Sequence, residues 1–204
     1  MSDEFAAANL TVGQINAIVK KLGGEEGALR FLRDELVVKP ADRNWSVWKT
    51  IKLGTPNFHS ADHFRQALKA SGMKLGDWAS DILGKPEFTV SDKETELDLV
   101  VVTVKELGFK SGATREKVYA RAKELGLDLC PPEVGPQLRL QYADQPNNEW
   151  ILIGMDPIRD SGGYLGVFSV ERGVSGLWLC SGRDGGPDYV WDAGSRWVFI
   201  RSRK

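Results

Sequence analysis

The sequence predicts an α+β protein: a small helical N-terminal domain, residues 1–88, followed by a second domain, residues 89–204, in which two helices flank an antiparallel sheet. Of the 14 lysines, 13 precede residue 151, whereas 10 of the 22 glycines and three of the seven tryptophans follow residue 150. Lys- and Ala-rich segments favour helices, while Gly-rich segments with interspersed Trp, Val and Phe favour short strands joined by tight turns. The composition therefore predicts helices early in the chain and sheet late.

The first domain is expected to open with a helical hairpin. Thr11 is a suitable N-cap, apolar residues recur at spacings of three and four up to Leu22, and two glycines then end the helix. A second amphipathic helix is expected to run until Pro40 stops it. A short strand at 45–51, a helix from Ser60 to Gly72, a helix at 75–83 and a linker at 84–88 complete this domain.

The second domain is expected to begin with a buried strand, because residues 97–104 are almost continuously apolar. Helices should follow from Thr114 to Gly126 and around residues 131–142. Gly-rich turns then separate four predicted strands, at 150–155, 165–170, 177–180 and 196–201.

Charge and targeting signals restrict the function classes. The 27 Lys and Arg against 28 Asp and Glu give a net charge of -1, so no overall attraction to nucleic acid or an anionic membrane is expected. The first residues are acidic, and no apolar stretch reaches membrane-spanning length, which predicts a cytoplasmic protein. Cys130 and Cys180 are too few for a disulfide framework and are expected to be reduced thiols.

Catalytic, metal and cofactor motifs are weak. His59 and His63 have the spacing of two ligands on one helical face, but no third ligand is evident and His59 precedes the expected N-cap. With only these two histidines and no nucleophile motif near them, a hydrolase triad is not expected, and no Gly-rich phosphate loop follows a strand. The sequence thus predicts a non-enzymatic protein without metal or cofactor.

The order of elements from residue 89 onward resembles the C-type lectin fold, in which two helices flank an antiparallel sheet and the first and last strands pair. Calcium-binding lectins of this fold use a Glu-Pro-Asn or Gln-Pro-Asp loop, and this chain has Gln145-Pro146-Asn147. That tripeptide precedes the strand at Trp150 instead of following the second strand, so it is interpreted as a surface turn and not as a calcium site.

Four segments resemble an uncharacterised bacterial family whose members differ most in about their last thirty residues. They are LTVGQINAIVKKLGGEEGALRFLRDEL, LCPPEVGPQLRLQY, DQPNNEWILIGMDPIRDSGG and RWVFIRSRK. This pattern is similar to the variable proteins of diversity-generating retroelements, in which an error-prone reverse transcriptase substitutes at adenines and rewrites the end of the target gene. The resemblance implies that the tail forms a diversified face for an unknown protein or small-molecule ligand.

Two features of the tail fit this resemblance. Trp178, Trp191 and Trp197 have a codon without adenine, so adenine mutagenesis would spare them as a scaffold. Many residues between them are reachable from an Asn or Asp codon by changing adenines only, although a pair of Gly- and Asp-rich surface turns would have a similar composition. The expected ligand-binding residues are Leu179, Cys180, Ser181, Gly182, Arg183, Asp184, Gly185, Asp188, Tyr189, Trp191, Asp192, Ala193, Gly194 and Ser195. Tyr189 and Arg183 are expected to contribute most.

An alternative function uses the N-terminal hairpin. Lys20, Lys21, Arg30 and Arg33 could contact phosphates in a helix-turn-helix, which would indicate a DNA-binding regulator or a toxin-antitoxin-like component. Four acidic residues offset these charges, so nucleic-acid binding is the less favoured hypothesis. The same pattern also suits a homo-oligomer formed through the N-terminal helices.

Overall fold

The computed structural model describes residues 10–37, 44–183 and 188–202, without the side chain of Arg183. The chain divides into two compact units, residues 1–41 and residues 42–204.

The N-terminal unit contains a helical hairpin of α1 (Val12–Lys21) and α2 (Gly24–Leu32). Thr11 caps α1 as predicted: its hydroxyl accepts from the backbone N–H of Gln14, and the Gln14 side chain accepts from the Thr11 backbone N–H at 2.8 Å. Gly27 is required where the helices meet, because a Cβ there would lie 1.7 Å from the carbonyl oxygen of Leu22. The second helix ends at Leu32, earlier than predicted, and Asp34 then adopts a positive φ.

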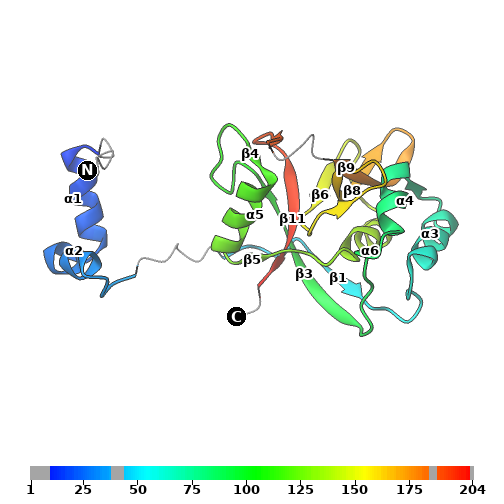
Figure 1. The fold of residues 1–204 in the computed structure, drawn as a ribbon, viewed down its shortest axis with the longest axis horizontal. Coiled ribbons are helices and arrows are strands. Elements are labelled where there is room, and N and C mark those ends of the chain that lie inside the picture. The colour runs from blue at the N-terminus through cyan, green and yellow to red at the C-terminus, as the bar shows by residue number, and fades with distance from the viewer. Residues whose placement is uncertain (1–9, 38–43, 184–187, 203–204) are drawn as a thin grey trace. The chain divides into compact units, whose positions relative to one another are not determined.

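The C-terminal unit is built on a nine-stranded sheet with the main order β1-β3-β11-β6-β8-β9-β2; β5 pairs with β11 and β7 with β8 (Figure 1). These strands are β1 (Lys49–Leu53), β2 (Lys74–Leu75), β3 (Thr95–Thr103), β5 (Leu127–Asp128), β6 (Trp150–Ile153), β7 (Ile158–Arg159), β8 (Leu165–Gly173), β9 (Gly176–Arg183) and β11 (Arg196–Arg201). A separate ladder joins β4 (Ala113–Thr114) to β10 (Val190–Trp191).

Helices cover both sides of this sheet, with α5 on one side and α3, α4 and α6 on the other (Figure 1). Their bounds are α3 (Ala61–Ala70), α4 (Asp77–Leu83), α5 (Arg115–Glu124) and α6 (Val134–Gln141). On the α5 side, the ring of Tyr119 packs edge-on against Trp197, with centroids 5.6 Å apart. On the α6 side, Gly135 lies so close to Phe168 that an added Cβ would be 2.6 Å from its side chain.

The predicted domain boundary at residue 88 is corrected by this arrangement, because the second compact unit begins at Asp42. Residues 42–88 contribute β1, which pairs with β3, and β2, which pairs with β9. Phe64 and Phe88 are buried, and Phe88 packs edge-on against Phe168 of β8. Apolar residues such as Phe64 and Phe88, which were predicted to belong to a separate helical domain, therefore complete the core of the sheet unit.

The predicted strands after residue 89 are observed, although two of their pairings are not antiparallel. The first and last of them, β3 and β11, pair antiparallel with Trp197 opposite Val102. However, β6 joins β11 in parallel, and β2 joins β9 in parallel, so the sheet is mixed and not purely antiparallel. A parallel neighbour is possible here because long connections, with helices or loops, separate these strands along the chain.

Candidate functional site

The β9 residues that are expected to bind ligand lie on opposite sides of the sheet, because successive side chains of a strand alternate. Leu179 and Ser181 are paired with Val170 and Phe168 and therefore lie on the α6 side. Leu179 is completely buried there. Its assignment as a ligand-binding residue is wrong, since it is part of the core.

Cys180 and Gly182 lie on the other side of β9, the side that α5 covers farther along the sheet. An added Cβ at Gly182 would meet Leu152, Trp191 and Trp150, which places this position against the aromatic side chains. Cys180 is half-buried. Of the residues predicted on β9, these two are the ones that lie on the α5 side.

Trp191 is also a framework residue. It is 4% exposed, pairs with Ala113 in the β10–β4 ladder, and packs edge-on against the buried Trp197 with centroids 5.3 Å apart. Its indole N–H has no acceptor in the described ranges. Such burial leaves little of Trp191 for direct contact with a ligand, so the expectation for this residue is corrected.

The loop residues around β10 are more accessible. Asp188, Asp192 and Gly194 are exposed, and Tyr189 is 45% exposed. Ala193 and Ser195 are half-buried, and the backbone carbonyls of both accept hydrogen bonds, from Lys105 and Val104 respectively. The backbone of this loop is thus tied to the end of β3 while several side chains face solvent. The predicted residues Asp184 and Gly185 and the side chain of Arg183 lie outside the described part of the chain.

A chain of aromatic contacts connects the accessible rings to the core. Tyr189 packs edge-on against Trp191 at 5.0 Å, and Trp150, which is 38% exposed, lies 5.8 Å from Trp191. Trp191 in turn contacts Trp197 beneath it. Rigid packing of this kind holds exposed rings in place, and aromatic rings are frequent hot spots of binding surfaces.

Sheet register places a carboxylate between two tryptophans on the same side. Trp150 of β6 lies opposite Glu171 of β8, and Glu171 lies opposite Trp178 of β9. On the α5 side of these three strands, Leu152, Val167 and Ser169 are fully buried. We call the remaining part of this side the open face, defined by Trp150, Glu171, Trp178, Cys180 and Gly182. Apart from Trp150, which is exposed, these residues are half-buried, whereas on the opposite side of the same strands Ile151, Phe168, Val170 and Leu179 are all fully buried.

Sequence reasoning identified neither Trp150 nor Glu171 as a functional residue. A signal existed for Trp150 alone, which begins the predicted strand at 150–155, where successive side chains alternate between the two sides of a sheet, whereas Glu171 lies just beyond the predicted strand at 165–170. Which strands are neighbours, and in which register, could not be read from that alternation.

The thiol of Cys180 is not activated for nucleophilic chemistry. Burial, the negative charge of Glu171 and a hydrogen bond to its carboxylate raise the pKa of Cys180 to about 12. Burial alone raises the pKa of Cys130 even further. Both cysteines are therefore protonated thiols at neutral pH, and thiolates are the reactive form.

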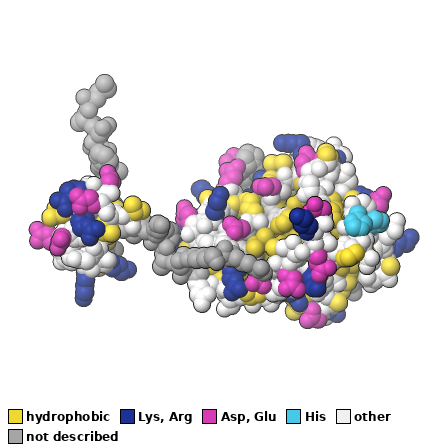
Figure 2. All heavy atoms as spheres, turned by 90° about the horizontal axis from the view of Figure 1, so that it is seen from below, with side chains coloured by type: hydrophobic (Ala, Val, Ile, Leu, Met, Phe, Trp, Pro, Cys, Tyr) yellow, Lys and Arg dark blue, Asp and Glu magenta, His cyan; other side chains and the backbone are white. Residues whose placement is uncertain are grey.

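The two histidines adjoin one another without forming a metal site. The Nδ1 of His63 accepts the backbone N–H of His59 at 3.1 Å, and the ring centroids are 6.0 Å apart. Within the described ranges, no three His, Cys, Asp or Glu side chains are grouped to hold a metal ion. Figure 2 shows the histidines together on a face of the C-terminal unit where acidic and basic side chains are interspersed.

A hollow of about 450 Å³ adjoins His59 and includes Asp62 and Arg65 among its lining residues. The Arg65 guanidinium is committed within the fold: it pairs with Asp62 at 2.7 Å and donates to the carbonyl oxygen of Ser80 at 2.7 Å. The hollow therefore offers no uncommitted guanidinium to a ligand.

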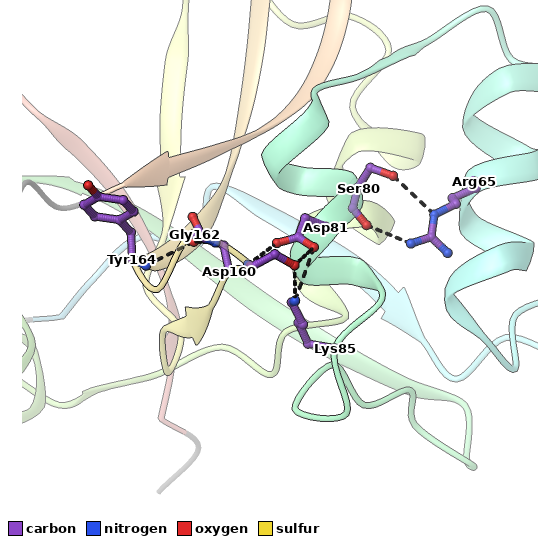
Figure 3. A network of polar contacts seen from close by, with 8 residues as sticks. Arg65, Ser80, Asp81, Lys85, Asp160, Gly162 and Tyr164 are labelled. Atoms are coloured by element: carbon purple, nitrogen blue, oxygen red, sulfur yellow. Dashed lines mark hydrogen bonds and ion pairs between the residues drawn. The ribbon is translucent and has the colours of Figure 1, made fainter.

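A polar network next to this hollow ties a loop to α4 (Figure 3). The carboxylate of Asp81 accepts from the backbone N–H and the hydroxyl of Ser161, at 2.6 and 2.7 Å, and pairs with Lys85 at 3.2 Å. The buried carboxylate of Asp160 accepts the backbone N–H groups of Gly162 and Tyr164 and shapes the loop itself. The Lys85 ammonium donates to the Ser161 hydroxyl at 2.6 Å, and that hydroxyl in turn donates to Asp81. Asp81, Lys85 and Ser161 therefore form a structural clamp.

Comparisons of the chain with family models, with curated proteins and with solved structures found no match. Among the described residues, no helix combines the length and apolar character needed to cross a membrane.

Proposed function

We propose that the C-terminal unit is a non-enzymatic ligand-binding module of the C-type-lectin-like class, whose β9–β11 segment is a diversified binding face of the kind found in retroelement variable proteins. Its ligand is an unknown protein or small molecule. The proposal requires neither metal nor cofactor.

One observation carries most of the weight: residues in the same short segment divide sharply between core and surface. Leu179, Trp191 and Trp197 are buried, whereas Asp188 and Tyr189 between them are exposed. Substitutions at exposed sites away from special features usually change stability by no more than about 0.5 kcal/mol, so such a segment can change its contacts while keeping its fold.

The layered arrangement supports the fold assignment within this proposal. Helices α5 and α6 lie on opposite sides of the sheet, and the strand that follows the linker pairs with the last strand, β11. The mixed pairing of β6 with β11 and the addition of β1 and β2 at the two edges extend this arrangement.

The test is deep sequencing of the last hundred or so bases of the gene, with its flanking DNA, across a population of source cells. We expect substitutions at adenines of a near-identical repeat, concentrated in codons of exposed positions such as Asp188, Tyr189 and Asp192. Codons for Leu179 and Trp191 should not vary. A tail that is invariant, or that varies evenly between buried and exposed codons, would refute the proposal.

DNA binding through the N-terminal hairpin is the alternative hypothesis. The basic residues Lys20 and Lys21 end α1, but α2 begins with Glu25 and Glu26, and Arg33 pairs with Glu35 at 3.1 Å. Four Lys or Arg are thus balanced by four Asp or Glu between residues 10 and 37. Duplex binding with a steep dependence on salt would favour this alternative, because phosphate contacts release counterions.

A further inference from the structure

The carboxylate of Glu171 lies on the open face without a cationic partner among the described residues. Its Oε1 accepts from the Ser169 hydroxyl at 2.9 Å, and the neighbouring Cys180 is a neutral thiol. Both of these contacts are uncharged, and a half-buried carboxylate is ordinarily compensated by a cation or by several donors. The negative charge of Glu171 is therefore available to a cation supplied from outside the chain.

An accessible aromatic ring stands directly beside this carboxylate. Trp150 lies opposite Glu171 across β6 and β8, and side chains opposite each other in an antiparallel pair have Cβ atoms about 4.5–5.5 Å apart. The Trp150 ring is held by its contact with Trp191 and is 38% exposed. The face of an indole attracts cations more strongly than that of any other aromatic side chain.

The neighbouring tryptophan, Trp178, is already in contact with a cationic side chain of the protein. The ammonium of Lys74, on strand β2, lies 5.0 Å from the ring centroid of Trp178. Lys74 is exposed and forms no ion pair with Glu171. In the row Trp150, Glu171, Trp178 and Lys74, the ring of Trp178 therefore has a cation from the chain, whereas the ring of Trp150, beside Glu171, has none among the described residues.

We propose that Trp150 and Glu171 together bind a guanidinium or ammonium group of the ligand. The inference rests on the proposed function, because it assigns a chemical class to the ligand of the same face. A guanidinium fits best, since its plane can stack on an indole while its N–H groups donate to a carboxylate. A divalent metal ion is disfavoured because the described residues offer it no group of three ligands.

The experiment titrates the full chain with N-acetyl-arginine amide and, in parallel, with the neutral isostere N-acetyl-citrulline amide, and follows the indole N–H signals by NMR. We expect a saturable shift of the Trp150 signal with the arginine probe. Citrulline, which keeps the shape but loses the charge, should bind at least about fivefold more weakly.

Variants separate the two contacts. Glu171→Gln keeps an oxygen acceptor for Ser169 but removes the charge, and Trp150→Leu removes the ring; each should weaken arginine binding about fivefold. The matched control is Glu94→Gln, which removes an exposed carboxylate that pairs with Lys52 at 3.1 Å near β1; binding should not change. Lys74→Gln removes a like charge from the row and should tighten binding about twofold.

Equal binding of the two probes, absence of a saturable shift, or unchanged affinity of both Glu171→Gln and Trp150→Leu would overturn the inference. Unfolding midpoints of the variants show whether a loss reflects unfolding. Failure of the cation site can be distinguished from failure of the proposed function. Adenine-directed variation with no arginine binding refutes only the cation site. Arginine binding with an invariant tail refutes only the diversified face.

Discussion

Truncation of Leu179 is the sharpest test of where the binding segment ends and the core begins. Leu179 is fully buried on the α6 side of β9, paired with the fully buried Val170. Leu→Ala at such a site loses the transfer free energy of the removed carbons and leaves a cavity, which together cost about 3 kcal/mol. For a unit of this size, we expect Leu179→Ala to lower the melting temperature by roughly 6–12 °C.

The assay is chemical and thermal unfolding of the full chain, followed by tryptophan fluorescence. The matched control is Asp188→Ala, at an exposed position nine residues further along the segment, which should change stability by no more than about 0.5 kcal/mol. A Leu179→Ala protein as stable as the control would refute the placement of Leu179 in the core. A control as damaging as Leu179→Ala would refute the claim that the exposed positions are free to vary.

Three further predictions concern other parts of the chain. Gly135→Ala should cost about 1–3 kcal/mol, measured by urea unfolding, because its Cβ would lie 2.6 Å from the buried Phe168; an unchanged midpoint would contradict the close packing of α6. The pKa of Asp81 is lowered by hydrogen bonds from Ser161, so its stabilising contribution is complete above the unfolded-state pKa of about 4 and is lost as pH falls through the lower folded-state value. Asp81→Asn should therefore remove part of the acid sensitivity of unfolding between about pH 5 and pH 2, and an identical pH profile would argue against the clamp. Ile18, which is 45% exposed in a hairpin with balanced charge, is expected to contribute to self-association, so Ile18→Glu should lower the mass found by sedimentation; equal masses would count against a hairpin-mediated oligomer.

Local sequence signals identified most of the helices and strands. The caps at Thr11 and Ser60 mark the observed helix starts, and the apolar run at residues 97–104 coincides with β3. Such signals suffice because helix capping and burial patterns depend on residues within one or two turns. The end of α2 was misplaced because the apolar spacing continues past Leu32, where Asp34 takes a left-handed conformation that spacing does not reveal.

The candidate site was only partly predictable. The chain segment and its exposed members, such as Tyr189, were expected from composition, but the expected ligand-binding residues also included the buried Leu179. Composition does not distinguish successive positions of a strand, and a shift by one residue exchanges core and surface. The neighbours Trp150 and Glu171 were missed because they lie on other strands, separated by 21 residues in sequence yet opposite each other in the sheet.

The sequence by itself determined the α+β class, the helical hairpin, the apolar first and last strands and the lack of recognisable metal and catalytic motifs. These depend on residue type and on short-range periodicity, which folding does not alter. Tertiary structure alone decided that residues 42–88 complete the sheet unit, that β6 lies between β11 and β8, and that Glu171 lies between two tryptophans. Pairing between distant segments depends on the burial of apolar area over the whole sheet, and no local pattern contains that information.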